Sequence, residues 1–153
     1  MKQLFRIMAF AVLALLAHGP ALASSDKGSA DDAVALVRKA SAYLKAHGKE
    51  KAYAAFSDAA GQFKDRDLYI FVIDFNGKLH AHGANPKLID KNLVDLKDAD
   101  NKPFIKELID VAKSKGKGWV DYKWPHPVTK AIESKSSYVE KVDDVFIGCG
   151  IYK

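Results

Sequence analysis

Beyond residue 29 the apolar positions repeat every three or four residues, which is the spacing of one face of an α-helix. The preceding Ser29-Ala30-Asp31-Asp32 has the form of a capping box before a helix. Gly48 interrupts this repeat, which then resumes and ends before Gly61. The pattern predicts two helices, or one long kinked helix, whose apolar positions are Ala33, Leu36, Val37, Ala40, Leu44, Ala52, Tyr53, Ala55 and Phe56.

At residue 68 the pattern changes from helical spacing to a continuous apolar run. Residues 68–75 are β-branched and aromatic on both alternating faces, as in a central strand. Asn76-Gly77 is a strong signal for a tight hairpin turn, and residues 78–82 have the pattern of the return strand. We therefore predict a β-hairpin here.

The second half of the chain contains one more helical pattern and three more strand patterns. Residues 83–101 have the composition of a long loop. A helical pattern follows and ends at Gly116, with Phe104, Ile105, Leu108, Ile109 and Ala112 at apolar positions. Residues 118–124, about 131–142 and 145–152 have strand patterns. Hairpin links at both ends favour an antiparallel sheet of five strands with the third helix crossing one face, which is an α+β fold with a PAS-like arrangement.

The first 23 residues have the pattern of a signal peptide. Lys2 and Arg6 precede an uncharged apolar run at residues 7–17, which is too short to span a bilayer, and Ala21-Leu22-Ala23 matches a cleavage site. We expect residues 1–23 to be removed and residues 24–153 to form one exported domain, periplasmic if the chain is bacterial. The alternative is an uncleaved N-terminal anchor.

Composition excludes several classes of function. Removal of the leader would leave 130 residues, enough for a core without disulfides, and would lower the formal net charge from +5 to +3. The lysines are interspersed with acidic residues, so the sequence shows no cluster of basic residues of the kind that binds nucleic acid. Cys149 is the single cysteine, which excludes an internal disulfide and a c-type haem site. We expect its thiol to be buried and unreactive.

A two-residue turn at Asn76-Gly77 would determine which residues of the hairpin share a face. Phe71 would then lie opposite His82, and Ile73 opposite His80. With Tyr69, these residues would line a face that mixes aromatic rings with two imidazoles, as a ligand pocket does. The alternative is that both histidines lie on an edge strand and face solvent.

Further candidates lie on the later strands. Trp119, Tyr122 and Trp124 share one strand, although Trp119 and Tyr122 are three apart and cannot both face inward on a regular strand. Lys135 lies in mid-strand, where it would pair with a carboxylate if it reached a pocket, and Tyr138 follows. The alternatives are ordinary aromatic packing and an exposed lysine.

His80 and His82 are also candidates for a metal pair. His126 and Cys149 could add ligands, but their spacing matches no known metal motif. We find no nucleophile arrangement, phosphate loop or nucleotide fingerprint. We therefore expect no metal, no cofactor and no enzymatic activity.

From Ala33 to the C-terminus the chain resembles the single Cache domains, which are extracytoplasmic sensor modules of bacteria. The matching stretches, in family order and at family-like spacing, are residues 68–74, 79–83, 118–125, 135–139 and 147–152. The resemblance implies a long N-terminal helix on a PAS-like sheet and a pocket for small ligands, often short carboxylates. Most relatives sit in chemoreceptors or histidine kinases, which links the family to chemotaxis and signal transduction. This sequence shows no second membrane helix and no output domain.

The sequence therefore predicts an exported module without catalysis, which binds a small organic acid for sensing or for presentation to a membrane receptor or histidine kinase. The predicted site combines a lysine for the carboxylate, three phenols, two imidazoles and three aromatic walls: Lys135; Tyr69, Tyr122 and Tyr138; His80 and His82; Phe71, Trp119 and Trp124. One alternative is a periplasmic metal- or cofactor-binding accessory protein that uses His80 and His82. Another is a structural subunit of a membrane complex.

Overall fold

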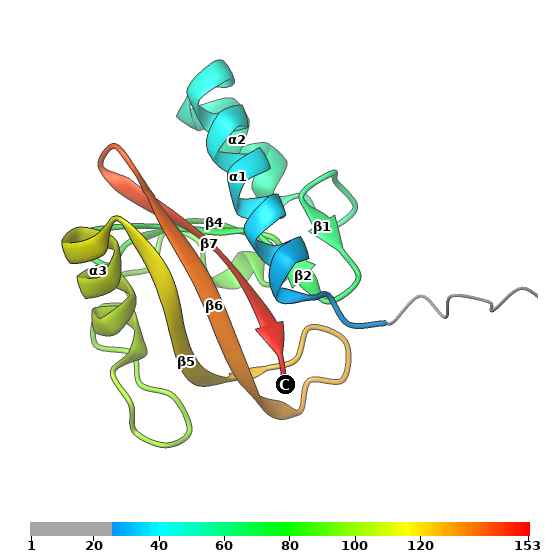
Figure 1. The fold of residues 1–153 in the computed structure, drawn as a ribbon, viewed down its shortest axis with the longest axis vertical. Coiled ribbons are helices and arrows are strands. Elements are labelled where there is room, and N and C mark those ends of the chain that lie inside the picture. The colour runs from blue at the N-terminus through cyan, green and yellow to red at the C-terminus, as the bar shows by residue number, and fades with distance from the viewer. Residues whose placement is uncertain (1–25) are drawn as a thin grey trace, which may run out of the picture.

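The computed structural model describes residues 26–153, so the predicted signal peptide and its cleavage site lie outside the described residues. In the described part, helices cover both faces of a five-stranded antiparallel sheet (Figure 1). No helix within residues 26–153 is long and apolar enough to cross a membrane. The arrangement confirms the predicted α+β fold.

The N-terminal helical pattern forms two helices, α1 (Ala30–His47) and α2 (Lys49–Ser57). The predicted capping box is present at the start of α1. The Ser29 hydroxyl accepts a hydrogen bond from the Asp32 amide at 3.2 Å, and the Asp32 carboxylate accepts one from the Ser29 amide at 3.0 Å. Gly48 separates the helices because its φ of 77° lies in the left-handed region, which favours glycine.

The main sheet has the strand order β4-β3-β7-β6-β5. Its strands are β3 (Phe71–Asp74), β4 (Leu79–His82), β5 (Lys117–Pro125), β6 (Ile132–Val142) and β7 (Val145–Tyr152). The C-terminal strand therefore lies at the centre of the sheet. It brings the hairpin from the first half of the domain next to the strands of the second half.

The remaining elements connect or flank this sheet. A small two-stranded sheet of β1 (Lys64–Asp65) and β2 (Leu68–Tyr69) precedes β3, and its first strand was not predicted from the sequence. A short 3-10 helix, η1 (Pro86–Leu88), lies in the predicted loop. The crossover helix α3 (Phe104–Lys115) ends at Gly116, as predicted.

The β3–β4 hairpin turns at the predicted place but through a longer loop. The Asp74 amide donates to the Lys78 carbonyl at 3.0 Å, which leaves three residues in the loop, and Gly77 has a φ of 88°. The predicted two-residue turn at Asn76-Gly77 is therefore wrong.

A β-bulge corrects the register further along the same hairpin. Ile73 lies opposite Leu79, not opposite His80, and the register then shifts by one residue. Beyond this point Phe71 lies opposite His82, as predicted. The bulge moves His80 to the other face of the sheet but leaves His82 where the sequence placed it.

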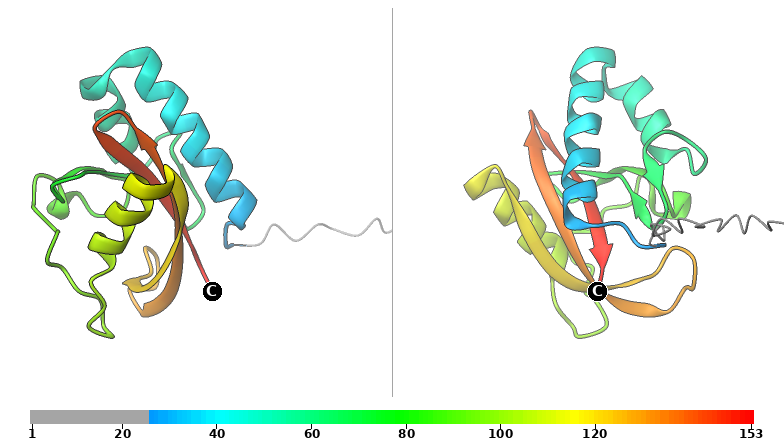
Figure 2. Two further views of the ribbon diagram at one scale, coloured as in Figure 1. Left: turned by 60° about the vertical axis from the view of Figure 1, so that its left-hand side comes forward. Right: turned by 45° about the vertical axis from the view of Figure 1, so that its right-hand side comes forward.

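The two faces of the sheet carry separate cores. α1 packs on β6 and β7, and α2 on β4, while α3 packs on β5 and β6 from the opposite side (Figure 2). Residues of the long loop, including Leu93, join α3 in the second core. We call the two sides of the sheet the α1 face and the α3 face, after the helices that cover them.

Two glycines of β7 leave room on the α3 face for larger side chains. A Cβ atom at Gly148 would overlap the Phe71 ring, and one at Gly150 would overlap the side chains of Lys135 and Ser137. The side chains of Phe71 and Lys135 therefore lie across the central strand, where any other residue would exclude them.

Replacing Gly148 with alanine should destabilise the fold, because the added methyl group must displace an aromatic ring on a central strand. Overpacking of this kind typically costs about 1–3 kcal/mol. Urea unfolding of Gly148→Ala measures the loss. In a Phe71→Ala background the same change should cost much less, since the ring is gone. Equal costs in both backgrounds would contradict this packing.

Candidate functional site

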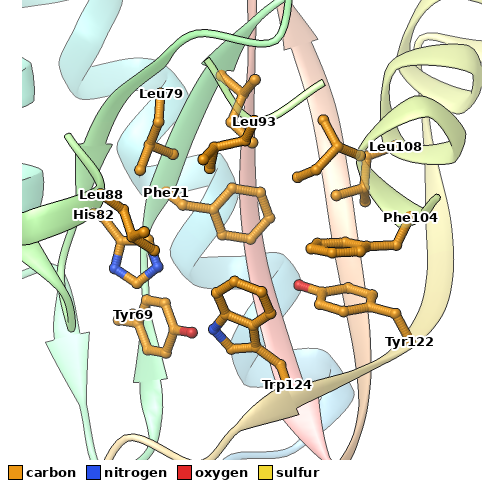
Figure 3. Close-up of a pocket in the computed structure, with 12 residues that line it drawn as sticks. Tyr69, Phe71, Leu79, His82, Leu88, Leu93, Phe104, Leu108, Tyr122 and Trp124 are labelled. Atoms are coloured by element: carbon orange, nitrogen blue, oxygen red, sulfur yellow. The ribbon is translucent and has the colours of Figure 1, made fainter. Parts of the chain in front are cut away.

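A cavity lies on the α3 face between the sheet, α3 and the loop (Figure 3). Its volume of ≈ 20 Å³ is room for about one water molecule. The indole of Trp124 lies between Tyr69 and Tyr122, with the Phe71 ring above it (Figure 3). This inner cavity is lined by Tyr69, Phe71, Ile73, Leu79, His82, Leu88, Leu93, Phe104, Ile105, Leu108, Tyr122 and Trp124.

A larger outer cavity adjoins the inner one. Its volume is ≈ 310 Å³, within the range of small-molecule sites, and it shares Tyr69, His82 and Trp124 with the inner cavity. Lys87 and Lys130 also line it, so its charge suits an anion. Trp124 belongs to the walls of both cavities.

The amine of Lys135 lies behind the Tyr69 wall of these cavities. Its Nζ donates to the Tyr69 hydroxyl at 2.6 Å and lies 4.1 Å and 4.9 Å from the ring centroids of Tyr69 and Tyr152. The residue is 1% exposed, and its amine forms no ion pair within residues 26–153. Burial lowers the pKa of Lys135 from 10.5 to about 7. Aromatic rings and one hydroxyl therefore hold this amine without an opposing carboxylate.

Three tyrosines on neighbouring strands flank the amine. Tyr122 and Tyr152 lie opposite Lys135 on β5 and β7. The hydroxyls of Tyr69 and Tyr152 are 3.5 Å apart, Tyr152 donates to the Pro125 carbonyl at 2.9 Å, and the Tyr122 hydroxyl lies 2.8 Å from the hydroxyl of a β6 serine. Burial raises the pKa of all three phenols above the ordinary value, so they remain neutral hydrogen-bond donors.

His82 is a neutral donor at the boundary of the two cavities. Its Nδ1 accepts hydrogen bonds from the amides of Ala84 (3.2 Å) and Asn85 (2.9 Å), so the proton of the neutral ring lies on Nε2. Burial, followed by the nearby charge of Lys135, lowers the pKa of His82 to about 3. The ring centroid lies 4.8 Å from that of Tyr69.

The structure does not bring His80 into the site. The bulge turns this residue to the α1 face, where its ring stacks on Tyr53 of α2 at 5.4 Å and its Nε2 lies 3.0 Å from the Asp74 carboxylate. The predicted pairing of His80 with His82 on one face is therefore wrong. Within residues 26–153, no three His, Cys, Asp or Glu side chains form a group that could hold a metal ion.

Trp119 and Tyr138 also lie away from the cavities. They pair across β5 and β6 on the α1 face, with ring centroids 5.4 Å apart. Strand alternation explains this, because Tyr122 faces the cavity and Trp119 is three residues away from it. The structure thus brings together six of the predicted site residues and separates three from them. The six are Tyr69, Phe71, His82, Tyr122, Trp124 and Lys135.

Sequence reasoning missed the covering layer and one phenol. Leu88 and Leu93 come from the long loop, and Phe104 and Leu108 come from α3. The helical period of α3 did identify its apolar face, but no signal linked that face to the site. Tyr152 could have been found, because it lies at the same alternating positions of β7 as Gly148 and Gly150.

Cys149 points away from this site into the α1-face core. It is fully buried, as predicted, and burial raises the pKa of its thiol to about 12. A thiol with this environment is a weak nucleophile. Its unreactive character remains a prediction.

A polar chain links the site to the start of α1. His126 lines the outer cavity, and its ring lies 4.6 Å from that of Tyr152. Its Nε2 is 3.8 Å from Oδ2 of Asp67, a buried carboxylate whose other oxygen accepts from the Gly28 amide at 2.6 Å. Gly28 precedes the cap of α1, so the cavity wall and the first residues of the domain are in contact through two side chains.

Comparisons with known proteins agree with this architecture. The family model described as single Cache domain 2 matches residues 23–153. The solved structure of a methyl-accepting chemotaxis protein from Vibrio parahaemolyticus is 28% identical, with a TM-score of 0.69, and the match covers 80% of this chain and 86% of that one. A structure titled "Structural basis for carboxylic acid recognition by a Cache chemosensory domain" is 26% identical, with a TM-score of 0.68, covering 80% and 91%.

Two curated proteins are similar over part of their length. The methyl-accepting chemotaxis protein McpP of Pseudomonas putida is 34% identical over 90 residues, which are 58% of this chain and 16% of that protein. The sensor histidine kinase MctS of Rhizobium johnstonii is 37% identical over 89 residues, which are 57% and 19%. This chain therefore spans less than a fifth of either relative.

The buried amine should give the fold a characteristic pH dependence. Between pH 7 and 10.5 the unfolded state binds a proton on Lys135 that the folded state has lost, so the stability contributed by this group rises with pH. Relative to a Lys135→Met variant, the wild type should gain about 3 kcal/mol of unfolding free energy between pH 6 and 9.

Urea unfolding of both proteins at the two pH values measures this change. The comparison with Lys135→Met cancels the contributions of Cys149 and the tyrosines, whose raised pKa values act in the opposite direction at high pH. If the gap between the two proteins were the same at pH 6 and 9, Lys135 would titrate as an ordinary exposed lysine.

Proposed function

We propose that this chain, which belongs to the single Cache domain 2 family, is an extracytoplasmic sensor module that binds a small organic acid through its carboxylate. The family and the chemotaxis and histidine-kinase relatives support the sensor role. The choice of ligand rests on the chemistry of the two cavities.

One observation carries the proposal, which is the buried Lys135 amine without a carboxylate partner. An isolated buried charge is costly, and pairing with a carboxylate recovers much of that cost. Tyr69, whose hydroxyl accepts a hydrogen bond from the amine, lines both cavities. A carboxylate that displaced this hydroxyl from Nζ would accept a hydrogen bond from the amine and a second one from the Tyr69 hydroxyl. The ligand would return the lysine to its charged form.

The surrounding residues support a short organic acid rather than a bare anion. Tyr69, Tyr122 and the Nε2–H of His82 supply neutral donors, while Phe71, Leu93 and the other inner-cavity side chains are apolar. A polar head among the donors and a small apolar body in the inner cavity satisfy both parts of the site. Because the inner cavity has room for about one water, binding requires Trp124 or its neighbours to move.

The cellular context follows from the family and from the predicted leader. We take residues 1–23 as a cleaved signal peptide and residues 24–153 as the ligand-binding domain, which places it in the periplasm. Its partner would be a membrane receptor or histidine kinase, since both curated relatives combine a similar segment with a much longer chain. No catalytic step is part of this proposal.

Lys135→Ala should weaken carboxylate binding by about two to three powers of ten. Removing one partner of a buried ion pair typically costs about 3–5 kcal/mol, and each tenfold in affinity is 1.4 kcal/mol. A thermal-shift screen of short carboxylates, amino acids and divalent metals identifies the best compound, and calorimetric titration measures its affinity for each variant.

Lys141→Ala is the matched control, because Lys141 lies on the same strand and its amine is 5.5 Å from the Phe75 ring, outside both cavities. It should bind the acid as the wild type does. Equal affinities of wild type and Lys135→Ala would refute the proposed carboxylate contact, and a response to metals alone would favour a metal-binding function.

Ligand binding should also change the fluorescence of Trp124. The chain has two tryptophans, and Trp119 lies on the other face of the sheet, so a Trp119→Phe variant reports on the cavity wall. Saturating the best acid should shift the emission of this variant, whereas a Trp124→Phe variant should show little change. A response confined to Trp119 would place the ligand on the α1 face.

A further inference from the structure

A second hollow lies on the α1 face, remote from the proposed ligand site. Its volume is ≈ 650 Å³, and it lies between α1, the α3–β5 junction and β6. We call it the basic groove; it is lined by Arg38, Ser41, Ala42, Lys45, Lys115, Gly116, Lys117 and Glu140. None of these residues lines the inner or outer cavity.

The basic groove concentrates unpaired positive charge. Its four cationic residues are exposed, and none forms an ion pair within residues 26–153. Lys49 and Lys102, on other parts of the surface, do form such pairs. Lys117 lies opposite Glu140 in the sheet, yet the Glu140 carboxylate accepts its hydrogen bond from the Tyr138 hydroxyl at 3.1 Å. The cations therefore face a groove with a single carboxylate in its wall.

Two further features mark this groove as a contact surface. The Ser41 hydroxyl is buried without a hydrogen-bond partner, although the residue lines the groove. Beside the groove, Trp119 is 39% exposed and lies on the same face as Lys117, two residues along β5. A serine hydroxyl that lacks a partner within the domain can accept a hydrogen bond from a second chain once neighbouring side chains move, and an exposed indole is covered when a second chain binds.

We propose that the basic groove binds an acidic peptide segment of a partner protein. Arg38 and Lys45 lie seven residues apart on α1, about 10 Å along the helix axis, so two separate anionic groups of one partner can each contact one of them. An extended peptide with carboxylates at alternate positions spans this distance. Glu140 disfavours a denser polyanion. A second copy of the same groove is disfavoured too, because it would oppose like charges.

Binding of a synthetic acidic peptide tests this proposal. The probe is a fluorescein-labelled peptide of alternating Glu and Ala, about ten residues long, with a Gln-for-Glu peptide as its neutral control. Fluorescence anisotropy should show binding of the acidic peptide that weakens as salt rises, and no binding of the neutral one. Lys45→Glu/Lys117→Glu should weaken binding at least about tenfold. Trp119 should show the largest changes in an NMR titration.

Matched variants separate the groove from general charge effects and from the ligand site. Lys51→Glu/Lys97→Glu changes the net charge equally at exposed lysines outside the groove and should alter affinity less than about twofold. Lys135→Ala should bind the peptide like the wild type. Equal losses in the two double variants would overturn the proposal. Stronger binding to anionic phosphatidylglycerol vesicles than to the peptide, lost in the groove variant, would overturn it in favour of a membrane surface.

Discussion

The site depends on the burial of the Lys135 amine among tyrosines at the centre of the sheet, where no carboxylate of residues 26–153 pairs with it. The amine reaches this position because Gly150 leaves space across β7, and it stays there with one hydrogen bond, to Tyr69. Burial favours its neutral form, whereas a ligand carboxylate would favour the cation. On the proposed function, binding of an acid would therefore change the charge state of this group, which is a suitable starting point for a sensor.

The contacts around this amine extend to the start of the domain. Tyr69 and Tyr152 connect it to His126, and His126 adjoins the buried Asp67 that holds Gly28. Any rearrangement of the tyrosines on ligand binding would act on side chains that already touch the residues before α1. These contacts are a physical basis for coupling between the cavity and the start of α1. Such coupling requires two conformational states of the domain with different affinities for the ligand.

Much of the fold could be predicted because its signals are local. The capping box at Ser29, the helix end at Gly116 and the last strand follow from short patterns, and the structure confirms them. The hairpin shows the limit of such signals. The longer turn shifted the register by one residue, and the bulge at His80 shifted it back, so Phe71 and His82 pair as predicted while His80 does not. A β-bulge in a strand of four residues has no clear signal in the sequence.

Strand alternation also decides how much of the site could be predicted. Four of the predicted site residues share one face of the sheet, namely Tyr69, Phe71, Tyr122 and Lys135. The same alternation places Trp119 and Tyr138 on the opposite face, although the family resemblance had grouped them with the other site residues. Leu88, Leu93 and Phe104 cover the site through tertiary packing, which sequence periodicity does not encode.

Titration of the Lys135 amine with and without ligand shows whether a bound carboxylate controls its charge. NMR of protein labelled with ¹³C in the lysine side chains follows its protonation with and without the best-binding organic acid. Free Lys135 should titrate near pH 7, and the bound acid should raise its pKa markedly, because a carboxylate then opposes the ammonium. A saturating acid that leaves the titration of Lys135 unchanged would contradict it.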